Sequence, residues 1–407
     1  MVLLFWLSCA CVAYVYVGYP ALMALWVRVR GRHSQSGIHN RASTARNPQL
    51  GVSIVLAARN EGARLAARLD NFLRLEYEGA RQIIVVSDGS TDDTLEVLAK
   101  YAPAVEVVAM PSSGKAAALN AGVARARHDV LVFADARQMF APDALRELVA
   151  PFADPTVGAV TGELILDVEA PERRGMAPDR RAHPSSRGGR DAERRTGVDR
   201  RRTVQSTIAD GVGLYWRYEK AIRRLESAVF STLGATGAIY AMRRALWTPL
   251  PHDTILDDVL APMRAVLAGY RTVFHERARA FDRAARDGDA EARRKIRTLA
   301  GNYQILWLEP RLLLPWRNPV WLQYVSHKVG RLLVPYALIG LMTSSMALAE
   351  QSVLYAVALA VQCLFYLLAG YGAWLDLRGQ LESRSTPALA ERWGAAPRPA
   401  RRGAVNV

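Results

Sequence analysis

Five side chains of this sequence could together bind a phosphorylated ligand and a metal ion. Each of them follows a short apolar segment, and they are Arg59, Glu61, Asp88, Lys115 and Asp135. Carboxylate oxygens bind divalent cations, and a lysine on a glycine-containing turn at the start of a helix suits a phosphate group. Acids that can hold a metal beside bases that can hold phosphate indicate a nucleoside diphosphate bound with a divalent ion.

Alternating strands and helices are expected to bring these side chains together. The expected strands are short apolar segments rich in β-branched residues: 52–58, 82–87, 105–110 and 129–134. Each is followed by a helix-like pattern, which predicts an α/β fold with a mostly parallel sheet covered on both faces. Right-handed crossovers place the carboxyl ends of such strands at one edge, where open α/β sheets bind ligands. Many α/β domains carry some polar residues at this edge, so the whole set, rather than any one residue, indicates a site.

Two common nucleotide-binding motifs are excluded. The segment "MPSSGKA", which contains Lys115, lacks the first glycine of a Walker A loop and has Ala116 where that loop has Ser or Thr. The segment "ADGVGLY" over 209–215 neither follows the first strand nor has the third glycine of a dinucleotide-binding fingerprint. The phosphate site therefore belongs to neither class.

Three uncharged apolar runs are long enough to cross a bilayer. They cover residues 2–27, 332–349 and 353–375. A buried core helix is the alternative for each run, and a cleaved signal peptide is the alternative for the first, although no basic segment precedes it. The Arg and Lys residues next to the runs would all lie on one side if the amino terminus were outside and residues 28–331 were cytoplasmic. We expect three membrane-spanning helices, with the α/β domain in the cytoplasm.

The net charge of +15 is partly concentrated in one arginine-rich segment. Residues 171–203 hold 11 Arg against five acids and are rich in Pro, Gly and Ser. Such a composition cannot bury enough apolar surface to order itself, so we expect a disordered insertion. A nucleic-acid arm, a basic loop near anionic lipid headgroups and a solvated loop without a partner are all compatible with it, and the neighbouring apolar runs favour the lipid headgroups.

Nine short motifs occur in an order that resembles family 2 glycosyltransferases. They are "AARNEGARL", "IIVVSDGSTDDT", "GKAAALNAG", "LVFADARQMF", "VGAVTGEL", "YWRYEK", "GATGAIYAMRR", "LDDVLAPMRA" and "RRKIRTLAGNYQIL". The resemblance covers about residues 50–310 apart from the insertion. It is to the membrane-bound branch similar to poly-N-acetylglucosamine, hyaluronan and cellulose synthases.

The resemblance implies a fold, a reaction and a location. The fold would be GT-A, and the protein would transfer a sugar, with inversion, from a UDP-sugar to a glycan or lipid-linked acceptor in exopolysaccharide or envelope polysaccharide synthesis. A divalent metal, Mg²⁺ or Mn²⁺, would be the cofactor. The protein would lie in the bacterial inner membrane, with polysaccharide-synthesis proteins as possible partners and without nucleic acid.

The resemblance also assigns roles to individual residues. Glu61 and Asp88, with Arg59 nearby, would contact the nucleoside, and Lys115 would lie near the ribose or diphosphate. Asp135 falls in the metal motif of the family. Three further residues come from the later motifs. Asp258 resembles the general base that deprotonates the acceptor hydroxyl, Asp257 lies beside it, and Arg297 would hold the departing diphosphate.

Three residues depart from the family pattern. Ser87 replaces the first acid of D-D-G-S, Arg137 occupies the second acidic place of D-x-D, and Thr298 replaces a tryptophan that would stack on an acceptor sugar. Asp135 alone would then hold the metal with diphosphate oxygens, or Arg137 would itself neutralise phosphate. The departures also leave open a second function, that of a catalytically weakened subunit that binds nucleotide or glycan within a polysaccharide synthase.

The expected domain organisation has six parts. They are a membrane helix over 1–27, a linker over 28–49, a GT-A domain over 50–300 with a disordered insertion at 169–203, interfacial amphipathic helices over 301–328, two membrane helices over 329–375 and a flexible basic tail over 376–407.

Overall fold

The structure, a computed structural model, describes residues 1–30, 50–167, 215–283 and 288–392. The expected insertion at 169–203 and most of the expected linker lie outside the described residues. The chain divides into two compact units, one formed by Ala13–Val334 and the other by Met1–Val12 together with the chain from Pro335 onward.

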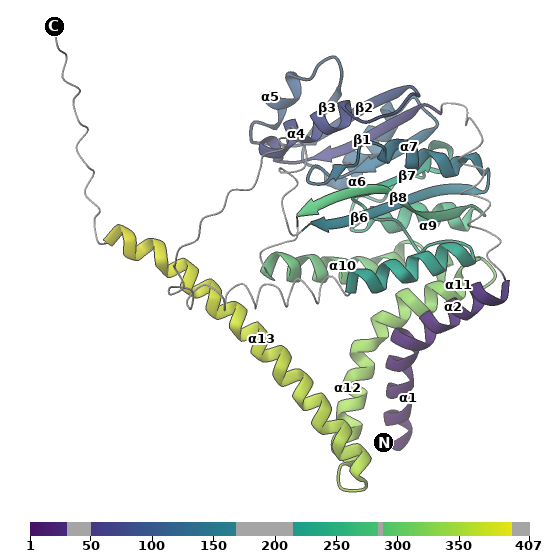
Figure 1. Cartoon of the computed structure of the whole chain (residues 1–407), viewed down its shortest axis with the longest axis vertical. Coiled ribbons are helices and arrows are strands. Elements are labelled where there is room, and N and C mark those ends of the chain that lie inside the picture. The colour runs from purple at the N-terminus through teal and green to yellow at the C-terminus, as the bar shows by residue number, and fades with distance from the viewer. Residues whose placement is uncertain (31–49, 168–214, 284–287, 393–407) are drawn as a thin grey trace, which may run out of the picture. The chain divides into compact units, whose positions relative to one another are not determined.

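The unit Ala13–Val334 contains an eight-stranded mixed sheet, with strand order β3-β2-β1-β4-β7-β6-β8-β5 (Figure 1). Its strands are β1 (Val52–Ala58), β2 (Arg81–Asp88), β3 (Glu106–Met110), β4 (Val130–Ala134), β5 (Met139–Phe140), β6 (Val157–Asp167), β7 (Ile239–Arg243) and β8 (Arg271–Arg283). The first four strands pair in parallel, whereas β7 runs antiparallel to both β4 and β6. The four predicted strands and the mostly parallel α/β fold are confirmed.

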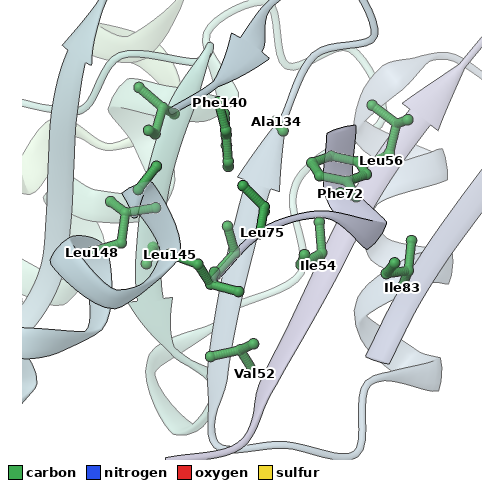
Figure 2. Packing of buried hydrophobic residues seen from close by; sticks show 14 of the residues in the cluster. Val52, Ile54, Leu56, Phe72, Leu75, Ile83, Ala134, Phe140, Leu145 and Leu148 are labelled. Atoms are coloured by element: carbon green, nitrogen blue, oxygen red, sulfur yellow. The ribbon is translucent and has the colours of Figure 1, made fainter. Parts of the chain in front are cut away.

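Helices cover both faces of the sheet. They are α4 (Gly62–Leu73), α5 (Thr94–Ala99), α6 (Lys115–Arg125), α7 (Ala144–Val149) and α9 (Asp257–Leu267). On one face, Ile54 and Leu56 of β1 pack with Phe72 of α4 and Leu145 of α7 (Figure 2). On the other face, Val55 packs with side chains of α6 and α9. Successive side chains of a strand point to opposite faces, so a strand buried on both faces is apolar throughout.

Gly122 lets α6 lie close to the sheet. A Cβ atom at this position would be 2.5 Å from Val55 Cγ1 and 3.2 Å from Val86 Cγ2. Because a packed core has no room for an added methyl group, only glycine fits without displacing β1 or β2. The close approach fixes the height of α6 above the strands, and therefore the position of the residue at its start, Lys115.

Three helical segments among the described residues are long and apolar enough to cross a membrane: Val2–Val29, Trp321–Leu348 and Val353–Leu375. The first is built from α1 (Val2–Ala13), the π-helical η1 (Tyr14–Gly18) and α2 (Tyr19–Arg30). The second comprises α11 (Trp321–Gln323), the π-helical η6 (Tyr324–Val329) and α12 (Gly330–Leu348). The third is the first part of α13 (Val353–Arg392).

Some boundaries differ from those expected. Helix α10 (Gly288–Leu308) continues across residue 300, and only the short η5 (Pro310–Leu313) separates it from the loop before Trp321. The second apolar segment begins at Trp321, inside the range expected for interfacial helices. Helix α13 continues to Arg392, where a flexible tail was expected from 376.

Buried polar contacts tie η1, α2 and η6 to the α/β domain within the unit Ala13–Val334. Glu226, in the helix over 215–229, accepts a hydrogen bond from the Tyr19 hydroxyl at 2.7 Å. The same carboxylate oxygen is 2.6 Å from His327 Nδ1. The two π-helical segments also meet, because the Tyr14 hydroxyl is 2.7 Å from Ser326 Oγ. These contacts join α2 and η6 to the helix that precedes β7.

Candidate functional site

The loops after β1 and β2 lie side by side at the carboxyl edge of the sheet. Asn60 has a positive φ of 55°, a conformation that asparagine tolerates better than most residues. Its side-chain Oδ1 accepts a hydrogen bond from Thr91 N at 2.8 Å, and its own N–H donates to Ser90 Oγ at 3.2 Å. This pairing holds the exposed Arg59 and the half-buried Glu61 beside the loop of β2.

Asp88 holds the turn that starts α6. Its buried carboxylate accepts hydrogen bonds from Ser113 N at 2.6 Å and from Gly114 N at 3.0 Å. Gly114 has a φ of 91°, which side-chain-bearing residues rarely adopt. Asp88 therefore fixes the backbone immediately before Lys115. The nucleoside contact expected for Asp88 would have to be made by a carboxylate that already accepts these backbone bonds.

Lys115 brings two distant acids together. Its Nζ lies 3.2 Å from Asp135 Oδ1 and 3.2 Å from Asp257 Oδ1. Burial alone would lower the pKa of the Lys115 ammonium, but the charges of Asp257, Asp135 and Asp258 outweigh burial and raise this pKa. The Lys115 ammonium therefore stays protonated. Its two ion pairs link the start of α6 to the end of β4 and to the start of α9. Ligand sites of open α/β sheets lie at such carboxyl ends of strands.

Asp258 is held by the backbone of the loop before β7. Its Oδ2 accepts a hydrogen bond from Gly237 N at 2.8 Å, and its carbonyl oxygen accepts one from Ala235 N at 2.7 Å. Burial and then the neighbouring charge of Asp257 raise the pKa of Asp258 to about 6, while Lys115 opposes the rise. A carboxylate with this pKa is ionised at neutral pH and is a better proton acceptor than an ordinary aspartate.

Arg297 lies next to the loop that leads into Asp257. Its Nη2 is 3.5 Å from the Ile255 carbonyl oxygen, and its side chain is exposed on α10. Gln304, on the same helix, accepts a hydrogen bond from Ile255 N at 2.9 Å and donates one to the Asp253 carbonyl at 2.6 Å. These bonds fix α10 against the loop before Asp257, and the exposed guanidinium of Arg297 lies beside that loop.

Arg137 is engaged by an acid that sequence reasoning missed. Its Nη2 lies 2.8 Å from Asp282 Oδ2 on β8, and Gln138 Nε2 donates to the same oxygen at 3.0 Å. Asp282 is 2% exposed, whereas Asp135 is 40% exposed. In the described part of the chain, no group of three His, Cys, Asp or Glu residues could hold a metal ion. Asp135 can offer a single carboxylate, so an ion here would take most of its ligands from a bound diphosphate and water.

His275 lies within β8 and is buried, with Nε2 2.9 Å from Glu147 Oε2 of α7. This pair joins α7 to the sheet. The segment "GATGAIYAMRR", to which the sequence assigned no role, supplies two residues of interest. They are Gly237, whose N–H donates to Asp258, and the buried Tyr240 of β7.

Residues 53–221 match the model of glycosyl transferase family 2. The chain carries a family 2 glycosyltransferase domain. This confirms the family that the order of the motifs predicted, and the match includes Lys115, Asp135 and the loops after β1 and β2.

Curated relatives of this glycosyltransferase domain are named as synthases of a polysaccharide and of a glycolipid. One is the poly-beta-1,6-N-acetyl-D-glucosamine synthase of Staphylococcus aureus, 31% identical over 154 residues, which are 35% of this chain and 37% of the relative. Another is the beta-monoglucosyldiacylglycerol synthase of Synechocystis, 37% identical over 126 residues, which are 29% of this chain and 26% of the relative. The chain thus spans about a third of the length of the relatives that it matches.

A solved structure shares the fold over nearly the whole chain. The mannosyltransferase PcManGT from Pyrobaculum calidifontis, solved in complex with GDP-Man and Mn²⁺, aligns with a TM-score of 0.58 and 20% identity. The alignment covers 95% of this chain and 99% of that one. The glycosyltransferase domain therefore has a GT-A fold, as predicted.

Replacing Asp88 by alanine is expected to destabilise the free protein. The change leaves the N–H groups of Ser113 and Gly114 without their buried charged acceptor, which costs about 2 kcal/mol. Thermal unfolding of the purified protein without nucleotide should show a lower Tm. Alanine at the exposed Asp253 is the matched control and should leave Tm unchanged. An equal Tm for Asp88→Ala and wild type would show that Asp88 does not hold this turn.

Proposed function

We propose that the protein is an inverting glycosyltransferase that transfers a sugar from a UDP-sugar to a glycan or lipid-linked acceptor at the membrane. The reaction belongs to the synthesis of exopolysaccharide or envelope polysaccharide. The observation that carries the proposal is the convergence of Lys115, Asp135, Asp257 and Asp258 at the carboxyl edge of the family 2 domain. The Staphylococcus aureus relative, named as a polysaccharide synthase, supports the class of product.

Asp258 is the proposed general base. The acceptor hydroxyl oxygen attacks the anomeric carbon from the side opposite the diphosphate, and Asp258 takes its proton. The bond from the anomeric carbon to the diphosphate oxygen breaks, and its electron pair leaves with UDP. This single displacement inverts the anomeric centre. Asp257, with Oδ1 on Lys115, keeps the cation close to the base and raises the pKa of Asp258.

Cations stabilise the charge that grows on the leaving diphosphate. Lys115, on the turn that starts α6, and the exposed Arg297 of α10 are the two proposed for this task. Arg59, Glu61 and Asp88 are proposed to contact the nucleoside. The hydrogen bonds that join the loops after β1 and β2 support this assignment, because they hold these residues along one edge.

Asp135 is the proposed protein ligand of a divalent ion, Mg²⁺ or Mn²⁺. Its half-exposed carboxylate at the end of β4 can bind an ion together with diphosphate oxygens. Such an ion would neutralise part of the charge of the diphosphate. Mn²⁺ in PcManGT, named with GDP-Man, is consistent with this choice.

Membrane helices and exposed aromatic side chains support an acceptor at the bilayer. Trp307 at the end of α10 is 87% exposed, and Trp316 in the following loop is 75% exposed. Tryptophan is enriched at membrane interfaces, so this region is proposed to lie on the membrane surface. We place the catalytic domain on the cytoplasmic side of the bacterial inner membrane, where polysaccharide-synthesis proteins would be its partners.

Asparagine at Asp258 tests the proposed function. The detergent-purified chain is given a panel of UDP-sugars, with GDP-mannose for comparison, and release of the nucleoside diphosphate is measured. Wild type should release UDP, and Asp258→Asn should turn over roughly 100- to 10,000-fold more slowly. UDP binding by calorimetry should be retained, and Asp253→Asn should match wild type. Full activity in Asp258→Asn would remove this residue from the mechanism, and UDP binding by wild type without transfer would favour the weakened-subunit function instead.

Turnover is expected to rise with pH through about 6, because only the ionised Asp258 accepts a proton. A folded-state pKa raised from 3.8 to about 6 also means that folding favours the protonated acid. The stability that Asp258 contributes is therefore present below about pH 4 and is lost as pH rises through 6. Profiles of kcat and Tm from pH 4.5 to 8 measure both effects. A kcat that stays flat across pH 6 would contradict the role of Asp258.

Metal removal is expected to lower transfer, and Mn²⁺ or Mg²⁺ should restore it. Because Asp135 is the single carboxylate proposed to hold the ion, Asp135→Asn should need a higher Mn²⁺ concentration for half-maximal turnover, about tenfold or more. The assay compares EDTA-treated wild type and variant across a Mn²⁺ titration. Equal activity with EDTA and with Mn²⁺ would show that Lys115 and Arg297 suffice without an ion.

A further inference from the structure

Tyr240 places a hydroxyl group without a partner deep in the glycosyltransferase domain. The residue lies in β7, where it is fully buried opposite Phe133 of β4. The two rings stack with centroids 4.7 Å apart, and Trp247 also stacks on Phe133, at 5.0 Å. Within the described residues the Tyr240 hydroxyl has no hydrogen-bond partner. A buried hydroxyl in this state costs free energy that phenylalanine, with the same ring, would avoid.

The hydroxyl lies near the acids of the site. Asp135 directly follows β4, two residues after Phe133, which pairs with Tyr240 of β7 across the strands. Tyr240 also packs in one cluster with Ala116 of α6 and Leu260 of α9, close to the starts of the two helices that carry Lys115 and Asp257.

The phenol is a permanent donor. Burial, and next the charges of Asp257, Asp258 and Asp135, raise the pKa of Tyr240 well above its usual value. The group therefore stays protonated and neutral at any pH at which the enzyme would work. It can give a hydrogen bond to a carboxylate, and it cannot add a further negative charge to the site.

Lys115 pairs with two acids in the structure but is also proposed to bind the diphosphate. In the structure its ammonium lies on Asp135 and on Asp257, whose side chain is 6% exposed. In the proposed reaction the same ammonium must turn towards the diphosphate. A buried carboxylate that loses its cation is strongly destabilised unless another donor replaces it. Asp257 therefore needs a second partner in the nucleotide-bound state.

We propose that Tyr240 is a positioning residue whose hydroxyl donates a hydrogen bond to Asp257 when a diphosphate draws Lys115 away. The proposal rests on the proposed function, since it requires a nucleoside diphosphate at Lys115. It explains why a tyrosine occupies a place where only its ring packs in the free protein. Through Asp257, Tyr240 supports the diphosphate contact of Lys115 without touching the substrate.

Phenylalanine at Tyr240 tests this role, because it removes the hydroxyl and keeps the ring. UDP binding by calorimetry with Mn²⁺, Tm, and KM and kcat for the donor are measured on the full chain. Tm should be unchanged or higher, whereas the Kd for UDP should rise about fivefold, the effect of one lost hydrogen bond. The donor KM should rise by the same factor with kcat unchanged, because the bond would form in both the ground state and the transition state.

Tyr77→Phe is the matched control. Its hydroxyl donates to the Leu50 carbonyl, away from the site, so this variant should lose stability and keep the wild-type Kd and KM. A Tyr240→Phe protein with unchanged Kd and KM would overturn the proposal. If wild type binds UDP but transfers no sugar, the Kd comparison still decides the role of Tyr240 while the proposed function fails. Wild type that binds neither UDP nor GDP would overturn both.

Discussion

The site depends on one cation placed between two acids. Asp135, Asp257 and Asp258 come from two distant parts of the chain, and three carboxylates at this spacing repel one another. The ammonium of Lys115, 3.2 Å from both Asp135 and Asp257, makes the arrangement stable. The same ion pairs fix the starts of α6 and α9 relative to the end of β4. One side chain therefore sets both the electrostatics of the site and the position of the proposed base.

The position of Lys115 is in turn fixed by backbone constraints. Asp88 accepts the hydrogen bonds of the turn before α6, Gly114 adopts a φ of 91° in that turn, and Gly122 lets the helix approach β1 closely. None of these three residues needs to touch a substrate for this purpose. A lysine has four rotatable side-chain bonds, so a rigid backbone at its base limits where the ammonium can reach. The loop and the helix thus position the site before any ligand binds.

The sequence predicted the strands and the edge of the sheet better than the contacts within the site. Continuous apolar segments identify β1 and β4, and the rule for parallel sheets then places Lys115 and Asp135 at one edge. Asp258 and Arg297 follow no such pattern and were assigned only through the resemblance. Two contacts could not be predicted: the ion pair of Arg137 with Asp282 and the stacking of Tyr240 on Phe133. In each, the two residues are far apart in the chain and meet only because β8 pairs with β5 and β7 pairs with β4. The domain boundary expected at 300 falls inside α10, which runs from Gly288 to Leu308.

Arg137, which stands where the family has the second acid of the metal motif, is paired with Asp282. Asp282 is 2% exposed and contacts both Arg137 and Gln138. If Arg137 turned towards a diphosphate, Asp282 would remain as a buried carboxylate without its cation, and such a loss costs several kcal/mol. The structure therefore pairs Arg137 with Asp282. In the proposed reaction, the charge of the leaving group would fall on Lys115, on Arg297 and on the ion proposed at Asp135.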